Sequence, residues 1–219
     1  MANHLRKNGV LESIYNSIIN GDASATTVGV QKALKAEHSP STILNDALIS
    51  AMEEVGLRFK AQEFYVPEML IAARAMKSGL SVLKPHLIEA GIEPVGKVVL
   101  GSVKGDLHDI GKNLVAMMLE GSGFEVLDLG VDVPPEKFVY AVREHTPRFV
   151  GMSALLTTTM PQMQTTIKAL KEVGLRDQVI VMVGGAPLSQ QFADGVGADL
   201  YAPDAATAAN LARILMNGG

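Results

Sequence analysis

The 219-residue sequence contains no cysteine. Without cysteine the chain can form no disulfide, no thiolate nucleophile, no iron–sulfur cluster and no zinc site with cysteine ligands. This absence is typical of proteins from a reducing compartment, and we therefore expect a cytoplasmic protein. Any metal must be held by histidine, by carboxylates or by a cofactor.

Long apolar runs are also missing. No stretch reaches the roughly 18 apolar residues that a membrane-spanning helix needs. Residues 1–9 carry two basic residues but no apolar segment of the kind found in secretory signals. We therefore expect no membrane partner.

A basic face is the third feature that the sequence lacks. Lys and Arg number 19 against 23 Asp and Glu, which gives a net charge of -4. Nucleic-acid binding relies on a positive field, so no nucleic-acid partner is expected. With 47% hydrophobic and 19% charged residues, the composition indicates a folded globular chain and excludes a disordered or fibrous one.

Residues 1–91 are predicted to form a helical domain. Apolar residues recur at helical spacing in four segments, which cover 10–19, 27–37, 39–59 and 67–85. Ser39 followed by Pro40 gives the third segment a typical N-cap and first helical residue. Four helices joined by short connections predict an antiparallel bundle.

The pattern changes after the Gly- and Pro-bearing segment 91–94. Short β-branched runs then alternate with amphipathic segments. The runs predict strands at 98–102, 125–129, 149–152, 179–183 and 199–202, and the segments predict helices at 110–119, 135–145, 160–173 and 205–216. Such alternation is typical of a parallel sheet covered on both faces. We expect residues 92–219 to form a doubly wound, Rossmann-like α/β domain.

The loop after the first predicted strand concentrates polar and small residues. Ligands of doubly wound sheets bind outside the carboxyl ends of the strands, and this loop carries Asp106 and His108. The carboxylate can hydrogen-bond one imidazole nitrogen, which fixes the tautomer and aims the other nitrogen outward as a metal ligand or general base. Taken alone, the pair fits a hydrogen-bonded polar loop at least as well.

Missing motifs narrow the chemistry further. No G-x-G-x-x-G follows the strand and no G-x-x-x-x-G-K-[ST] occurs, so the phosphate cradles of dinucleotide-binding and P-loop proteins are absent. The other histidines are His4, His38, His86 and His145, all on predicted helices or their ends. A catalytic metal normally takes three protein ligands, and one imidazole suffices only when a macrocycle supplies the others.

Three short motifs, each after a predicted strand, carry a resemblance to a known family. They are Asp106-x-His108-x-x-Gly111, Ser153-x-Leu155 and Gly184-Gly185. Together they resemble the signature of corrinoid (vitamin B12) binding domains of the base-off, His-on type. The segment 63–76 is similar to the helical cap domain that precedes this module in methionine synthase and in corrinoid proteins of methyltransferase systems. The resemblance covers nearly the whole chain.

The resemblance implies that the cofactor is cobalamin or a related corrinoid, and that His108 replaces the cofactor's own base as the lower axial ligand of cobalt. Asp106 would hydrogen-bond His108, and the next hydroxyl of this relay falls on Thr159, where methionine synthase has serine. In the family, cobalt cycles between four-coordinate Co(I) and six-coordinate methyl-Co(III), so the axial imidazole must come and go. A carboxylate that takes up or releases a proton would couple these steps to protonation.

The resemblance also implies which residues contact the cofactor. A slot for the displaced nucleotide tail needs small residues, although Gly184-Gly185 by itself also fits an ordinary turn between a strand and a helix. The implied contacts of the α/β half are Gly105, Asp106, His108, Asp109, Ile110, Gly111, Ser153, Leu155, Thr157, Gly184, Gly185 and Ala205. Phe59, Val66 and Met69 match residues that cover the methyl group, and packing in the bundle core would explain them equally well.

The function implied by the resemblance is that of a methyl carrier, more a substrate of enzymes than an enzyme. Its partners would be a substrate:corrinoid methyltransferase, a methylcorrinoid methyltransferase that uses tetrahydrofolate or coenzyme M, and a reductive activase. The methyl donor could be a methylamine, methanol, a methylated betaine or a methoxylated aromatic.

Other classes of protein share the corrinoid module. Cobalamin-based sensors add a DNA-binding domain and a tryptophan-bearing cap motif, whereas this chain has no tryptophan, no basic face and no expected room for such a domain. Adenosylcobalamin-dependent isomerases need a large barrel for the substrate. Storage of free cofactor stays open.

Overall fold

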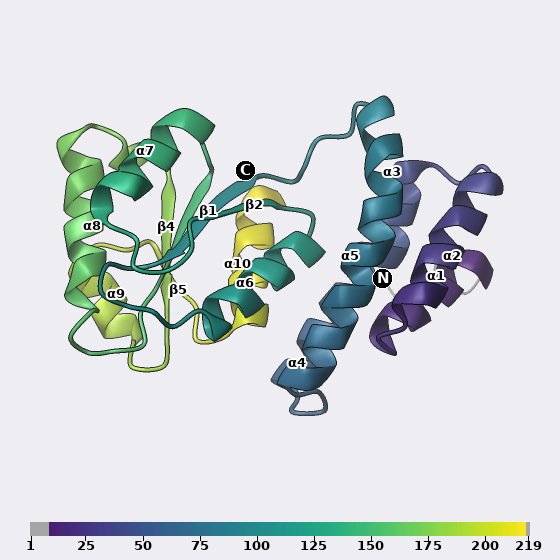
Figure 1. The fold of residues 1–219 in the computed structure, drawn as a ribbon, viewed down its shortest axis with the longest axis horizontal. Helices are drawn as coiled ribbons and strands as arrows, with labels where there is room; N and C mark the ends of the chain where they lie inside the picture. The colour runs from purple at the N-terminus through teal and green to yellow at the C-terminus, as the bar shows by residue number, and fades with distance from the viewer. Residues whose placement is uncertain (1–8, 218–219) are drawn as a thin grey trace. The chain divides into compact units, whose positions relative to one another are not determined.

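The structure is a computed structural model that describes residues 9–217. Residues 1–8, which include His4 and most of the segment 1–9 that lacks the features of a secretory signal, lie outside the described residues. Residues 121–123 aside, the chain divides into two compact units with a boundary between Glu93 and Pro94 (Figure 1). Each unit is described by itself below.

The N-terminal unit is a helical bundle, as the sequence predicts. Its first two helices are α1 (Gly9–Ile19) and α2 (Ala23–Lys35), and its last is α5 (Val66–Glu89). Between them the chain is helical from Pro40 to Lys60, as α3 (Pro40–Thr42), the π-helical segment η2 (Ile43–Ile49) and α4 (Ser50–Lys60). The four predicted helical segments are confirmed, although the π-helical turn was not predicted.

Helix α5 continues past the predicted end at Pro85. Proline removes a backbone donor and usually ends or kinks a helix, so the predicted helix ended at Pro85. Leu83 and Leu87, on either side of Pro85, are both buried. Burial of these side chains favours the continuation of the helix, which ends at Glu89.

An N-cap fixes the start of α3, and a buried hydrogen bond joins α1 to α2. The Ser39 hydroxyl accepts a hydrogen bond from the amide of Thr42, as predicted for an N-cap. Ser17 of α1 and Thr26 of α2 share a hydrogen bond of 2.8 Å between their buried hydroxyls. This contact locks the two helices in one register inside an apolar core.

The C-terminal unit is a five-stranded parallel sheet with the strand order β2-β1-β3-β4-β5. The strands are β1 (Lys97–Ser102), β2 (Glu125–Asp128), β3 (Phe149–Ser153), β4 (Ile180–Gly184) and β5 (Leu200–Tyr201). The helices are α6 (Ile110–Gly121), α7 (Pro135–His145), α8 (Pro161–Glu172), α9 (Gln190–Val196) and α10 (Ala205–Asn217). Figure 1 shows α6 and α10 on one face of the sheet and α7, α8 and α9 on the other, which confirms the doubly wound fold.

Helix α9 and the short 3-10 helix Arg176–Gln178 were not predicted. Ala193 is the only buried residue of α9, so no apolar stripe marks this seven-residue helix in the sequence. The cap residues were a usable signal. The Ser189 hydroxyl accepts from the Phe192 amide, and Gly197 ends the helix in the left-handed region at φ 79.

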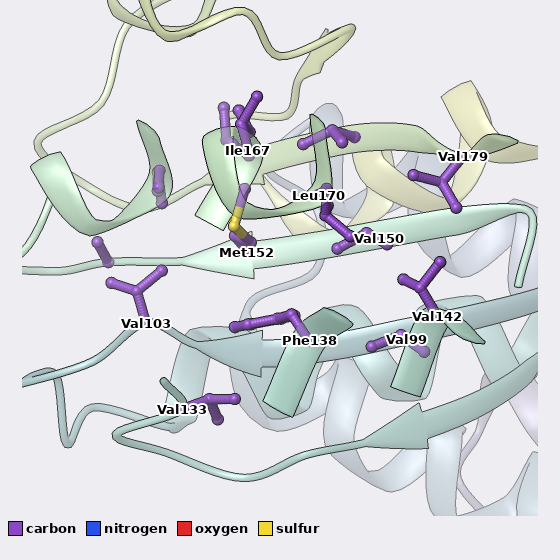
Figure 2. Close-up of a cluster of buried hydrophobic side chains, with 14 of the residues drawn as sticks. Val99, Val103, Val133, Phe138, Val142, Val150, Met152, Ile167, Leu170 and Val179 are labelled. Carbon is purple, nitrogen blue, oxygen red and sulfur yellow. The ribbon is translucent and has the colours of Figure 1, made fainter. Parts of the chain in front are cut away.

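The main core of this unit lies between the sheet and helices α7 and α8. Val99 and Val150 from the strands face Phe138 of α7 and Leu170 of α8 (Figure 2), and all four are buried. Burial of such large apolar side chains is the main force that holds the helices on the sheet.

The site is positioned by the carboxyl ends of the central strands. β1, β3 and β4 end in register, with Ser102 opposite Ser153 and Ser153 opposite Gly184. From β1 the chain continues to β2 on one side, while β3 lies on the other, so strand order reverses at this point. Ligands of such sheets bind at this reversal.

Candidate functional site

The loop between β1 and α6 is hydrogen-bonded to the end of β1. It begins with a turn in which the Asp106 amide donates to the Val103 carbonyl at 3.0 Å, and Gly105 has a left-handed φ of 82. The buried Ser102 hydroxyl donates to the carbonyl of His108 at 2.6 Å. The backbone of His108 is therefore fixed just before α6 begins.

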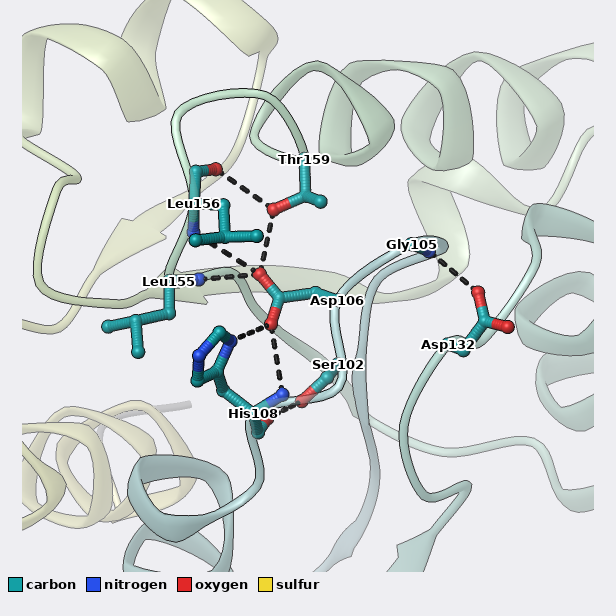
Figure 3. A network of polar contacts seen from close by, with 8 residues as sticks. All are labelled: Ser102, Gly105, Asp106, His108, Asp132, Leu155, Leu156 and Thr159. Atoms are coloured by element: carbon teal, nitrogen blue, oxygen red, sulfur yellow. Dashed lines mark hydrogen bonds and ion pairs between the residues drawn. The ribbon is translucent and has the colours of Figure 1, made fainter.

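Asp106 orients the His108 ring. The buried carboxylate accepts at Oδ1 from Nδ1 of His108 at 2.8 Å and from the His108 amide at 3.1 Å. Because an ionised carboxylate only accepts, Nδ1 carries the proton and Nε2 keeps its lone pair. The His108 side chain is 50% exposed, and Figure 3 shows this second nitrogen on the side of the ring away from Asp106.

The other carboxylate oxygen binds the loop after β3. Oδ2 of Asp106 accepts from the amides of Leu155 at 2.7 Å and Leu156 at 3.3 Å, and from the Thr159 hydroxyl at 2.7 Å. Figure 3 shows Asp106 between the two loops, with His108 on one side and Thr159 on the other. The structure thus brings together four of the residues singled out in the sequence.

Two opposing effects set the pKa of Asp106. Burial raises this pKa, whereas hydrogen bonds from the Thr159 hydroxyl, the Leu155 amide and the ring and amide of His108 lower it. The hydrogen bonds prevail, and the pKa lies well below the ordinary value of aspartate. Asp106 is therefore ionised near neutral pH in the cofactor-free protein. The proton exchange at this carboxylate that the resemblance implies stays a prediction.

Thr159 is the hydroxyl that the resemblance placed next in the relay. It is buried, and its Oγ1 donates to Oδ2 of Asp106 at 2.7 Å and lies 2.9 Å from the Leu156 carbonyl. The hydroxyl has a single hydrogen to donate, and the Asp106 carboxylate and the Leu156 carbonyl are both within reach of it. Thr159 is thus a donor to the ionised Asp106, and its part in a proton relay stays a prediction.

Close contact with neighbouring backbone requires glycine at positions 184 and 185. A Cβ at Gly184 would lie 2.8 Å from the Ala202 carbonyl oxygen, and one at Gly185 would lie 1.9 Å from that of Ala154. Gly185 also has a φ of 141, which side-chain-bearing residues rarely adopt. The sequence attributed both glycines to a cofactor slot, and the structure adds the close approach of neighbouring backbone as a sufficient cause.

Gly111 is different, because the fold does not require a glycine there. It lies in the first turn of α6, its φ is outside the left-handed region, and no heavy atom lies within 4 Å of a Cβ built on it. The space beside Gly111 is therefore open, as the site of a bound group must be.

Large apolar side chains are exposed in and next to the two loops that hold His108. Leu107, Ile110 and Leu155 are 71%, 74% and 42% exposed. Exposed apolar side chains gathered at one place mark a ligand or partner surface. Within residues 9–217, no group of three His, Cys, Asp or Glu residues could hold a metal ion. One free imidazole nitrogen, with exposed apolar side chains in the neighbouring loop residues, therefore fits a metal whose other ligands belong to a macrocycle.

The remaining predicted contacts of the α/β half lie at the same edge of the sheet. Ser153 is the last residue of β3, and Thr157 is exposed in the loop that follows. Asp109 is exposed before α6 and accepts at Oδ2 from the Asn113 side chain at 3.2 Å. Ala205 is buried at the start of α10. Their contact with a cofactor stays a prediction.

The three predicted residues of the helical unit differ in exposure. Val66 is exposed at the start of α5, Phe59 is partly buried in α4, and Met69 is 2% exposed. Their role in covering the cofactor stays a prediction.

Three contacts of this site were not found from the sequence. Ser102 binds the His108 carbonyl, as described above, and Asp132 binds the turn before His108. The Lys112 side chain is 1% exposed and places Nζ 2.5 Å from Oδ2 of Asp128, which ties the first turn of α6 to the end of β2. Polar residues of these types are usually exposed, so nothing in the sequence pattern marked them.

No helix within the described part of the chain, residues 9–217, has the length and apolar character to cross a membrane.

A parallel sheet with a carboxylate-oriented imidazole at its switch point, preceded by a helical unit, defines the class of B12-binding proteins. A family model of the B12 binding domain matches residues 96–211, and a second model with the same description matches residues 10–84. The chain belongs to the B12-binding family and is a corrinoid protein of the kind found in methyltransferase systems. Its cofactor is cobalamin or a related corrinoid, as the motifs implied.

Similar proteins match over almost their whole length. The chain is 41% identical to dimethylamine corrinoid protein 1 of Methanosarcina acetivorans, over 97% of this chain and 100% of that protein. It is 38% identical to trimethylamine corrinoid protein 1 of the same organism, over 96% and 98%. Among solved structures, the methanol:cobalamin methyltransferase complex MtaBC from Methanosarcina barkeri matches with a TM-score of 0.86 and 30% identity, over 97% of this chain and 81% of that one.

Proposed function

We propose that this protein carries a methyl group on the cobalt of its corrinoid between two methyltransferases. A substrate-specific methyltransferase loads the carrier, and a second enzyme that uses tetrahydrofolate or coenzyme M unloads it. A reductive activase restores the cofactor after accidental oxidation. Relatives named for dimethylamine and trimethylamine match at 41% and 38% identity, which supports a methylated amine as the donor.

The observation that carries this proposal is the free Nε2 of His108. Asp106 binds Nδ1 at 2.8 Å, so Nε2 is the nitrogen that is left to serve as an axial ligand. When bound, the corrinoid supplies a cobalt centre that accepts and gives up a methyl group. A ligand that is held in place but reversible is what such a centre needs from the chain.

The residues around His108 have separate tasks in this proposal. Asp106 keeps Nδ1 protonated and the ring in one orientation, and Ser102 holds the His108 backbone. Thr159 and the Leu155 amide donate to Asp106 and keep this carboxylate ionised. The apolar side chains beside His108 limit the access of water.

A methylation assay tests the proposal. Protein loaded with cobalamin and reduced to the Co(I) state is mixed with a dimethylamine-, trimethylamine- or methanol-specific methyltransferase and its substrate, and the cofactor spectrum is followed. We expect methylation that requires both the enzyme and a methylated amine. Protein that binds cobalamin but is methylated by none of these enzymes would contradict the carrier role.

A further inference from the structure

The loop that follows β2 contains an aspartate with an unusual backbone. Asp132 has a φ of 51, in the left-handed region that few residues other than glycine adopt. Asp tolerates this conformation better than most residues, yet it still costs free energy and persists only where the surroundings demand it. What Asp132 contacts is therefore informative.

Asp132 binds the backbone at both ends of the Gly105–Asp106 segment. Its Oδ1 accepts from the amide of Gly105 at 2.6 Å, and its own amide donates to the carbonyl of Asp106 at 2.9 Å. Figure 3 shows Asp132 on the opposite side of this turn from His108. Asp132 does not touch the imidazole, so any effect on His108 must pass through Asp106.

Backbone hydrogen bonds join the residues next to Asp132 to the end of β1. The Ser102 amide donates to the Gly130 carbonyl at 3.0 Å, and the Val133 amide donates to the Ser102 carbonyl at 2.9 Å. Val103 and Val133 form a parallel bridge, and both are buried. The end of β1 and the loop after β2 are thus joined by several backbone contacts, and Asp132 reaches from this joined segment to the turn.

We propose that Asp132 is a positioning residue that sets the His108 ligand through Asp106, an inference that rests on the proposed ligand role of His108. The turn at Gly105 has only backbone contacts within itself, and a left-handed glycine is its most adaptable point. The two hydrogen bonds of Asp132 hold this turn to the loop after β2. Without its carboxylate the Gly105–Asp106 segment gains freedom, and the carboxylate that orients His108 is less well placed.

Two substitutions separate the hydrogen bond from the backbone strain. Asp132→Gly removes the acceptor and suits a left-handed φ, whereas Asp132→Asn keeps an oxygen acceptor and also tolerates that conformation. The readout is electron paramagnetic resonance of the full chain loaded with cob(II)alamin, which reports the fraction of cobalt with an axial protein nitrogen. The comparison is made at the pH where half of the wild-type protein is ligated.

We expect Asp132→Gly to lower the ratio of ligated to unligated cobalt about fivefold, the size typical of one net hydrogen bond. Asp132→Asn should stay close to wild type, and neither variant should lower the thermal unfolding midpoint enough to explain the loss. An unchanged ratio in Asp132→Gly, or an equal loss in both variants, would overturn the inference.

Hydrogen exchange of the wild-type protein gives a second measurement that needs no variant to fold. The Gly105 amide proton should be protected, and rapid exchange would contradict the contact on which the inference rests. If wild-type protein binds cob(II)alamin without any protein nitrogen, the ligand assignment of His108 fails first. If wild type is ligated and Asp132→Gly behaves identically, only the role of Asp132 fails.

Discussion

Oδ1 of Asp106 lies 2.8 Å from Nδ1 of His108, and this contact determines which nitrogen of the ring is available. The carboxylate is buried and held by two loops, so it cannot turn to accept from the other nitrogen. A histidine tethered in this way presents Nε2 in one tautomer and one orientation. The contact is thus the physical basis for treating His108 as a ligand.

Asp106→Asn should destabilise the cofactor-free protein by about 3 kcal/mol at neutral pH, because several donors lose a charged acceptor. The pKa of Asp106 is lowered in the folded protein, so its stabilisation is fully present above the ordinary aspartate value of about 4 and is lost as the pH falls further. The stability gap between wild type and variant should therefore shrink from about pH 7 to about pH 2 in urea unfolding experiments. A gap of the same size at both pH values would contradict the lowered pKa.

Thr159→Val should raise the pKa of Asp106 toward its ordinary value, because the hydroxyl donor is replaced by a methyl group of similar size. The acid-induced loss of stability should then begin at higher pH, and the cost at neutral pH should be about 1–3 kcal/mol. Thr159→Ser keeps the donor and serves as the control. If the two variants behave alike in urea unfolding across pH, the hydroxyl does not have this role.

Gly111→Ala and Gly185→Ala should have opposite effects on the fold. Alanine at Gly111 meets no atom within 4 Å and favours the helix, so stability should stay the same or rise by about 0.5–1 kcal/mol. Affinity for cobalamin should nevertheless fall, by about tenfold if roughly 1.4 kcal/mol of contact is lost. Alanine at Gly185 would meet the Ala154 carbonyl and should prevent correct folding. Absorbance titration with cobalamin checks the first variant, and unchanged affinity would show that the open space is not used.

The architecture could be predicted from the sequence because each half has a clear pattern of apolar residues. The first half shows helical spacing throughout, and the second alternates strand-like runs with amphipathic helical segments. The parallel strands and their helices were found within a few residues. Two errors have local causes: α9 is too short to carry an apolar stripe, and burial of Leu83 and Leu87 carries α5 past Pro85. The caps Ser189 and Gly197 could have revealed α9, whereas the burial that accompanies the extension of α5 is not visible in a local pattern.

The site was predictable only in part. Asp106 and His108 stand two residues apart, so their contact could be argued from the sequence. Asp132 binds Gly105 from 27 residues away, and Lys112 and Asp128 pair across 16 residues. No spacing rule links such residues, because the sheet topology brings their loops together. Thr159 was found through the family resemblance and not through the local pattern.

The most direct test asks whether the nitrogen on cobalt belongs to His108. Protein is produced with 15N-labelled histidine, loaded with cob(II)alamin and measured by electron paramagnetic resonance beside unlabelled protein and His108→Ala. We predict that the triplet splitting of an axial 14N ligand becomes a doublet on labelling, and that His108→Ala loses the splitting from the protein. A triplet that survives histidine labelling would show that the axial nitrogen does not come from a histidine but from another source, such as the cofactor's own base. This result would contradict the account.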